Sequence, residues 1–183
     1  MSEREREIWN RRYSEPGFRM GDGPKRFLVE LAELLPGRGA VLDLGCGEGQ
    51  NLVWLAGRGL VGTGVDVSVV GLNKAAALSE AMEIDLELIE ADLDVWDPGG
   101  RQFQVVLCSH VLLRELVPKM RRAVAPGGLL LMENMMVGAP IPLRYVVETQ
   151  EMLHWFLGFR ILHYREITRD GIPVAQLAAR RPG

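Results

Sequence analysis

The sequence VLDLGCGEGQN, residues 41–51, decides how the chain is expected to fold. A short apolar run carrying Asp43 leads directly into three glycines, Gly45, Gly47 and Gly49. A glycine loop between a strand and a helix offers backbone N–H groups and the positive end of the helix dipole to a ligand. The stretch therefore predicts a strand, a ligand-binding loop and a helix, in that order.

Apolar runs alternate with stretches of helical period on both sides of this loop. The expected strands cover residues 40–44, 60–67, 85–92, 103–109 and 129–135. The expected helices cover residues 51–58 and 70–82, and a later helical stretch breaks or restarts at Pro118. The Pro-Gly-Gly at 126–128 is expected to separate that stretch from the fifth strand. This alternation is typical of βαβ units on a mostly parallel sheet.

The pattern changes after Pro142. A helix over 149–156 is expected, with Thr149 as its N-cap. Two further strands, 159–167 and 174–181, are separated by an Asp-Gly pair that indicates a tight hairpin turn. We therefore predict an α/β fold: a Rossmann-like, mostly parallel seven-stranded sheet flanked by helices, with a C-terminal antiparallel hairpin.

The composition is that of an ordinary globular protein. The chain has 183 residues, 48% hydrophobic and 25% charged, which suits one domain with a real core. A formal charge of -3 gives no basic footprint for nucleic acid. The charged start of the chain is unlike a signal peptide, and no run of about 18 apolar residues could span a bilayer. We expect a cytoplasmic protein without nucleic-acid or membrane partners.

Cys46 and Cys108 are the only two cysteines. They are too few for a disulfide framework and lack zinc-site spacing, so reduced thiols and no metal site are expected. Both fall at the same end of the expected sheet, where a soft thiol pair could touch a metalloid substrate. Small buried residues beside a glycine loop are the better interpretation.

Three features narrow the ligand of the glycine loop. The dinucleotide fingerprint G-x-G-x-x-G requires a third glycine at position 50, where this chain has Gln50. Asp66, at the end of the second strand, can accept hydrogen bonds from both hydroxyls of an adenosine ribose. Asp92, after the third strand, can accept the adenine amino group, or can be a turn residue. The two acids favour a nucleoside-containing ligand without separating NAD from S-adenosylmethionine, whereas Gln50 argues against the NAD fingerprint.

The order of four stretches matches a known family. VLDLGCGEGQN, GVDVS, EAD and FQVVLCSHVLL…APGGLLLMEN resemble the successive motifs of seven-stranded, class I S-adenosylmethionine-dependent methyltransferases, over residues 40–134. The head, residues 8–39, and the tail TQEMLHWFLGFRILHYREI resemble the small tellurite-resistance and thiopurine-type methyltransferases. The resemblance implies one methyltransferase domain over 1–183: an N-terminal helical cap (1–36), a cofactor-binding core (40–134) and a C-terminal helix and hairpin (143–181).

The resemblance also implies which residues bind S-adenosylmethionine, whose product form is S-adenosylhomocysteine. Asp43 and the glycine-loop backbone would hold the methionine part, and Asp66 the ribose. Val67, Asp92 and Leu93 would hold the adenine, and Ser109 would lie beneath the transferred methyl. The implied cofactor-binding residues are Trp9, Arg12, Tyr13, Asp43, Gly45, Cys46, Gly47, Gly49, Asp66, Val67, Asp92, Leu93 and Ser109.

Among these, Trp9, Arg12 and Tyr13 would close over the cofactor from the N-terminal helix, with Arg12 able to meet the methionine carboxylate. This set is chemically reasonable, because aromatic rings suit a sulfonium cation and a guanidinium suits a carboxylate.

His110 is the histidine next to the expected site, and it is the candidate catalytic residue because imidazole titrates near neutral pH. A pocket-shaping role is the alternative. No Asn/Asp-Pro-Pro-aromatic stretch follows the fourth strand, which favours a small-molecule acceptor over a nucleic-acid base. We expect methyl transfer by a monomer or homodimer. The rival functions are a catalytically idle cofactor-binding sensor or partner protein and, with less support, an NAD-type oxidoreductase.

Overall fold

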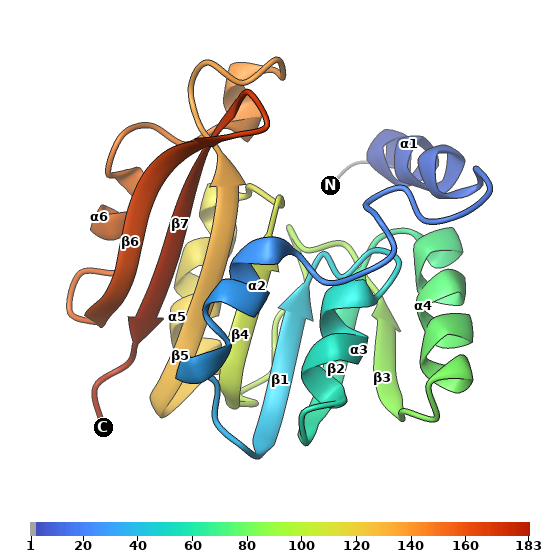
Figure 1. The fold of residues 1–183 in the computed structure, drawn as a ribbon, viewed down its shortest axis with the longest axis horizontal. Coiled ribbons are helices and arrows are strands. Elements are labelled where there is room, and N and C mark those ends of the chain that lie inside the picture. Colours follow the sequence, from blue (N-terminus) through green and yellow to red (C-terminus); the bar gives the residue numbers. More distant parts are fainter. Residues whose placement is uncertain (1–2) are drawn as a thin grey trace.

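Seven strands form one sheet in the order β3-β2-β1-β4-β5-β7-β6, with helices on both faces (Figure 1). The computed structural model describes residues 3–183, so the first two residues of the expected cap lie outside the described part. The helices are α1 Glu3–Tyr13, α2 Arg26–Glu30, α3 Gln50–Ala56, α4 Val69–Ala81, α5 Val117–Ala123 and α6 Glu151–Trp155, with 3₁₀ turns η1 Ala32–Leu34, η2 Arg114–Leu116 and η3 Leu143–Tyr145. The strands are β1 Gly39–Leu44, β2 Leu60–Asp66, β3 Leu86–Glu90, β4 Phe103–Ser109, β5 Val124–Met135, β6 Arg160–Arg169 and β7 Ile172–Arg180.

The order of the strands reverses beside β1. This strand pairs in parallel with both β2 and β4, and Leu44 lies opposite Val65 of β2 and Cys108 of β4. The carboxyl ends of the three strands therefore meet at one edge of the sheet. In open α/β sheets, ligands bind in the crevice outside this edge, where the strand order reverses.

Two apolar layers hold the sheet. Phe27 of α2 and Leu52 of α3 pack in one hydrophobic cluster, while Met120 of α5 and Met152 of α6 pack in the other, on the opposite face. All four side chains are buried. Burying one such side chain contributes roughly 1.5–3 kcal/mol, so these layers fix the strand ends that carry the site.

The C-terminal hairpin completes the sheet. β7 runs antiparallel to both β5 and β6, and Asp170 and Gly171 have φ angles of 50° and 79° at the turn. Positive φ at both central residues is the geometry that matches the twist of a two-residue hairpin. The predicted α/β fold, with its seven-stranded, mostly parallel sheet and terminal hairpin, is confirmed.

The hairpin is also tied to α2. Glu30, the last residue of α2, accepts hydrogen bonds from Arg26 at 2.8 Å, from Arg169 of β6 at 3.1 Å and from Arg165 of β6. The helix before β1 and the last strand pair therefore hold each other, although they lie at opposite ends of the sequence.

Two local predictions are wrong. Thr149 does not cap α6: the N-cap is Gln150, in the left-handed conformation at φ 59°, and it makes no side-chain cap. Glu151 instead reaches back to the Glu148 N–H at 2.9 Å. The Pro-Gly-Gly at 126–128 does not separate two elements, because β5 runs through it from Val124 to Met135. The strand bulges there, where its pairing register with β4 shifts. The backbone of Arg181 forms hydrogen bonds with residues 127 and 128.

Among the helices of residues 3–183, none is long and apolar enough to cross a membrane.

Candidate functional site

The glycine loop is packed tightly against its neighbours. Gly45, Gly47 and Gly49 all have positive φ, at 73°, 53° and 85°. A Cβ at Gly49 would lie 2.9 Å from the backbone Cα of Ala75 in α4. Side chains rarely adopt this backbone conformation, and here they would also collide with the neighbouring helix. The loop therefore needs glycine for conformation and for space.

The backbone N–H groups of this loop are already used inside the chain. Those of Gly45 and Cys46 donate to the Val65 carbonyl at 2.8 and 3.2 Å, and that of Gly49 donates to the Cys46 carbonyl at 3.0 Å. The Gly47 N–H donates to Asp66 Oδ2 at 2.9 Å. The expected role of these four N–H groups as ligand donors is therefore not supported, and nearby side chains are the next candidates for ligand contacts.

Asp43 supplies such capacity. It stands at the end of β1 with 1% of its surface exposed, and Oδ2 is buried without a hydrogen-bond partner among residues 3–183. Burial, with a smaller contribution from the charge of Asp66, raises the pKa of Asp43 to about 8. A buried carboxyl oxygen without a donor costs free energy, so this position favours a ligand that brings an N–H group or a positive charge.

Asp66 is the second buried acid of the crevice. Oδ1 accepts the Ser68 N–H at 2.8 Å and Oδ2 the Gly47 N–H at 2.9 Å. Burial raises the pKa of Asp66, and the backbone hydrogen bonds from Ser68 and Gly47 oppose that rise. Each carboxyl oxygen has a second lone pair, so the fixed side chain can still accept ligand hydroxyls.

The N-terminal helix covers the loop through Tyr13. Its hydroxyl would lie 2.6 Å from a Cβ at Gly47, and its ring packs on Gly71 at the start of α4. Trp9 stacks on Tyr13 with ring centroids 5.4 Å apart. Arg12, by contrast, is exposed, and its guanidinium lies 4.8 Å from the centre of the Trp9 ring. Tyr13 is therefore packed on the glycine loop, with Trp9 stacked on Tyr13 and Arg12 exposed against Trp9.

Glu48 is a site residue that the sequence analysis missed. Its side chain is fully buried, pairs with Lys74 of α4 at 2.9 Å and accepts the Arg19 N–H at 2.9 Å. Lys74 also donates to the carbonyls of Glu15 at 2.9 Å and Gly17 at 2.6 Å. These contacts fasten the segment between α1 and α2 onto the glycine loop. The sequence offered one signal for this role, namely that Glu48 is an acidic residue inside the glycine motif.

The adenine side is less open than expected. Asp92 accepts the Asp94 N–H at 2.9 Å on Oδ1, which is the turn role considered as its alternative. Leu93 is 0% exposed and belongs to the core, so its expected contact with an adenine ring is not supported. Val67 is buried as well, with 7% of its surface exposed beside Asp66.

Ser109 and His110, at the end of β4, carry two further polar atoms without partners among residues 3–183: Ser109 Oγ and His110 Nδ1, both buried. Val111 packs against the glycine loop, because a Cβ at Gly45 would lie 2.2 Å from its Cγ2. His110 Nε2 lies 3.2 Å from Oε1 of Glu133 on β5. Val111, two residues after β4, is therefore placed beside the loop.

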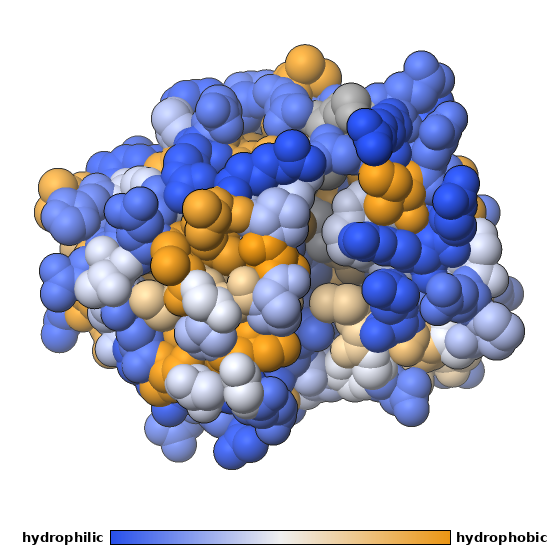
Figure 2. All heavy atoms as spheres, turned by 90° about the horizontal axis from the view of Figure 1, so that it is seen from above, coloured by the Kyte–Doolittle hydropathy of each residue, from blue (hydrophilic) through white to orange (hydrophobic). Residues whose placement is uncertain are grey.

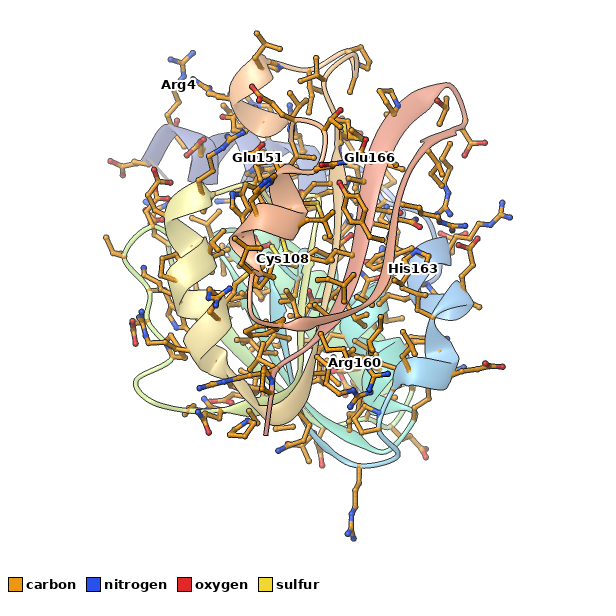
Figure 3. The ribbon with its side chains drawn as sticks, turned by 90° about the vertical axis from the view of Figure 1, so that its left-hand side faces the viewer. Arg4, Cys108, Glu151, Arg160, His163 and Glu166 are labelled. Atoms are coloured by element: carbon orange, nitrogen blue, oxygen red, sulfur yellow. The ribbon has the colours of Figure 1, made fainter. Side chains whose placement is uncertain are left out.

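The cysteines are placed as small core residues. Both are free and buried, and Cys108 lies inside the molecule behind the hairpin (Figure 3). Burial raises the pKa of the Cys108 thiol to about 12 and that of Cys46 well above its ordinary value. Within residues 3–183, no group of three or more His, Cys, Asp or Glu side chains could hold a metal ion. Neutral thiols are poor metalloid ligands, so the thiol-pair hypothesis gains no support.

Seen from above, the crevice end of the molecule has an apolar patch on the left and a furrow beside it (Figure 2). Exposed apolar side chains at this end include Val137 and Leu143, in the segment after β5, and Ile8 on α1. The Tyr145 hydroxyl donates to Glu5 at 2.9 Å and joins η3 to α1. A pocket between these two elements is lined by Arg4, Glu5, Ile8, Arg144 and Tyr145.

Comparison with known sequences gives one family. Residues 41–128 match the family model described as a methyltransferase domain. Malonyl-[acyl-carrier protein] O-methyltransferase of Salmonella typhimurium is 32% identical over 119 residues, which cover 62% of this chain and 47% of that protein. A ubiquinone biosynthesis O-methyltransferase of Coxiella burnetii is 30% identical over 95 residues, covering 48% and 40%. The matched region thus spans about half or less of the length of these relatives.

Solved structures agree in fold. NodS of Bradyrhizobium japonicum, an N-methyltransferase solved with S-adenosyl-L-homocysteine, superposes with a TM-score of 0.78 at 16% identity, covering 97% of this chain and 98% of NodS. TehB of Haemophilus influenzae superposes with a TM-score of 0.75 at 17% identity, covering 97% and 67%. These findings confirm the resemblance drawn from the sequence motifs. Residues 41–128 therefore match a methyltransferase domain, and the chain as a whole has the seven-stranded fold of NodS and TehB.

Proposed function

We propose that this chain uses S-adenosylmethionine to methylate a small-molecule acceptor. The observation that carries the proposal is a set of buried polar atoms without protein partners at the crevice edge: Asp43 Oδ2, Ser109 Oγ and His110 Nδ1 among residues 3–183. Buried polar groups are nearly always paired in folded proteins, so such a cluster indicates ligand contacts. The names of the matched relatives, two of them O-methyltransferases, support the same reaction.

The residues fit this cofactor. Asp43 Oδ2 would accept a hydrogen bond from the ammonium group of the methionine part. Asp66 would accept hydrogen bonds from the ribose hydroxyls. Tyr13 and Trp9 would close over it, with Ser109 beneath the reacting methyl. When bound, S-adenosylmethionine supplies an already activated methyl group. The chain then has to align an acceptor with it and exclude water.

Some expected residues have weaker support. Asp92 stays in the proposal at the adenine edge, and Val67 beside it. The roles of Cys46 and of the glycines are structural, because their N–H groups are used within the chain. Arg12 and Leu93 are left out, because the first is exposed and the second belongs to the core.

The proposal includes a single domain over residues 1–183, capped by residues 1–36, that acts as a monomer or homodimer. Two free, buried cysteines support a reducing, cytoplasmic location. The net charge of -3 supports an acceptor other than nucleic acid.

Calorimetric titration tests the cofactor. We expect S-adenosylhomocysteine to bind and NAD to show no binding. Asp66→Ala should weaken S-adenosylhomocysteine binding by roughly 1–3 kcal/mol, since hydrogen bonds to a charged group are lost. Asp66→Asn keeps the side-chain shape and should show part of this loss, which guards against misfolding of the alanine variant. Asp85→Ala is the matched control, because Asp85 is exposed at the opposite end of β3.

Binding of NAD in place of S-adenosylhomocysteine, or equal affinity in Asp66→Ala and Asp85→Ala, would refute the cofactor assignment. A broad acceptor panel, assayed for S-adenosylhomocysteine release, then separates an enzyme from an idle cofactor-binding protein.

A further inference from the structure

His110 is held against β5 by two contacts with one residue. Its backbone N–H donates to the Glu133 carbonyl at 2.8 Å, and its ring Nε2 lies 3.2 Å from Glu133 Oε1. The backbone of His110 is left-handed at φ 58°, a conformation that histidine adopts more readily than most residues. Backbone and ring are thus fixed to the same neighbour, and the imidazole has a defined orientation.

Glu133 is in turn fixed as a carboxylate. It is 3% exposed, its Oε2 accepts a hydrogen bond from Gln176 of β7, and Arg169 of β6 lies 3.4 Å away. Burial acts to raise the pKa of Glu133, but the hydrogen bonds from His110 and Gln176 and the charge of Arg169 outweigh it. The pKa therefore lies below its ordinary value of 4.5.

Further charges hold this arrangement in place. Gln176 accepts from Arg165 Nε at 2.6 Å, and Arg169 is anchored by Glu30 of α2 at 3.1 Å. Lys25, just before α2, is close enough for its charge to interact with Glu133. The charged groups that face the pair thus come from β6 and from the start of α2, and both are positive. They favour a charged Glu133 carboxylate over a neutral one.

The carboxylate determines which ring nitrogen of His110 carries hydrogen. An ionised carboxylate can only accept, so Nε2 must donate to Oε1 and Nδ1 keeps its lone pair. Nδ1 is buried and has no hydrogen-bond partner among residues 3–183. Val111, the next residue, packs on Gly45 of the glycine loop. His110 Nδ1 therefore keeps a free lone pair, on a ring whose orientation is fixed and whose neighbour in sequence packs on the loop.

We propose that Glu133 is a positioning residue that makes His110 Nδ1 the proton acceptor for a hydroxyl-bearing methyl acceptor. The inference rests on the proposed function and names the substrate class of that site. The acceptor oxygen forms the O–CH₃ bond with a lone pair, while the electron pair of the breaking S–CH₃ bond stays on sulfur. The hydroxyl proton moves to Nδ1, Glu133 stabilises the resulting imidazolium, and the proton then leaves to solvent.

The geometry favours an acceptor that must lose a proton, such as a neutral hydroxyl, over a carboxylate or a proton-free nucleophile. A carboxylate or a proton-free nucleophile needs no base, so an oriented Nδ1 would serve no purpose for it. A neutral hydroxyl is a weak nucleophile until its proton is removed, and general-base help of this kind typically contributes 10²–10⁴-fold.

Nitrogen NMR of the full chain tests the pair without any substrate. At a pH where the ring is neutral, His110 should show the Nε2–H tautomer as the dominant form, with its signals identified by their loss in His110→Asn. Asparagine suits this substitution because it also tolerates the left-handed backbone. Glu133→Gln should lower the proportion of the Nε2–H form. A dominant Nδ1–H form in the wild-type chain would overturn the proposal.

Turnover with two probe acceptors tests the substrate class. Phenol keeps its proton at pH 8, whereas 4-nitrophenol is largely ionised. We expect His110→Asn to lower the kcat for phenol by on the order of 10²–10⁴-fold and that for 4-nitrophenol by less than about tenfold. Glu133→Gln should lower the kcat for phenol with little change in KM. His154→Gln, which alters an exposed histidine of α6, should match the wild type.

Equal losses on both phenols in His110→Asn would overturn the base assignment. Methylation of proton-free dimethyl sulfide while both phenols stay unmodified would overturn the hydroxyl assignment. Failure to bind S-adenosylhomocysteine would refute the proposed function instead, and the tautomer would still decide the His110–Glu133 pair.

Discussion

The two sides of the crevice treat their buried acids in opposite ways. On the β1 side, Asp43 is left with an unpaired oxygen and a raised pKa of about 8. On the β5 side, Glu133 is bonded by three neighbours and its pKa is lowered. The difference shows where each side keeps its capacity for a ligand. On the β1 side the atom available to a ligand belongs to the acid itself, Asp43 Oδ2. On the β5 side it is His110 Nδ1, on a ring that Glu133 orients.

The largest effect is expected from crowding the β1 side. Gly49→Ala adds a Cβ at φ 85° that meets Ala75 Cβ at 2.6 Å and Cα at 2.9 Å. Strain and collision together should cost about 3 kcal/mol of unfolding free energy and lower Tm by on the order of 10 °C. Chemical and thermal denaturation measure both quantities.

The matched control is Gly127→Ala, in the bulge of β5. Gly127 also has positive φ, 72°, but a Cβ there would have no atom within 4 Å. Only the conformational cost of about 1 kcal/mol should appear. Equal destabilisation by the two substitutions would mean that the close packing of the glycine loop on α4 is unimportant.

A middle-sized effect should come from removing the unpaired acid. Because the folded-state pKa of Asp43 is raised to about 8, the folded chain holds a proton that the unfolded chain has released above pH 3.8. Its contribution to stability is therefore present at low pH and is lost as pH rises toward about 8. Asp43→Asn has no such proton, so its stability relative to the wild type should rise with pH between these two values, by on the order of 1 kcal/mol per pH unit.

Denaturant unfolding across this pH range measures the difference, and S-adenosylhomocysteine binding should weaken in the same variant. Parallel stability curves for Asp43→Asn and the wild type would show that Asp43 is ionised in the folded chain.

The smallest effect is expected on the other side, with the opposite sign. The pKa of Glu133 is lowered from 4.5, so its stabilisation is present above that value and is lost as pH falls through the lower folded-state pKa. Glu133→Gln should cost roughly 1–2 kcal/mol near neutral pH, because hydrogen bonds to a charged group are weakened, and close to nothing in acid. Glu90→Gln, at an exposed position of β3, is the control. A stabilised Glu133→Gln variant would remove the contrast between the two sides.

How well sequence predicts each side follows from how local its contacts are. The glycine loop and Asp66 are joined by a hydrogen bond spanning 19 residues, so strand, loop and second strand could be recognised as one pattern. β4 has the bounds expected from its apolar run, Phe103–Ser109. Such elements can be predicted because hydrophobic periodicity and glycine spacing are visible in the sequence itself.

The β5 side could not be predicted in this way. Glu133 bonds Gln176, 43 residues later, and Arg169 bonds Glu30, 139 residues earlier. No local pattern links these residues, because the pairing depends on the hairpin register and on α2 lying against it. The wrong cap at Thr149 has a related cause: the Gln150 N–H is bonded to Glu166 of the hairpin, at 2.6 Å, rather than within its own turn.

The ion pair of Glu48 with Lys74 and the hydrogen bond from the Arg19 N–H to Glu48 affect how this part of the chain opens. They join the glycine loop to the chain segment between α1 and α2, so the loop, α4 and this segment should open as one cooperative unit. A ligand enclosed beneath Tyr13 would then leave at the rate at which a buried ion pair separates.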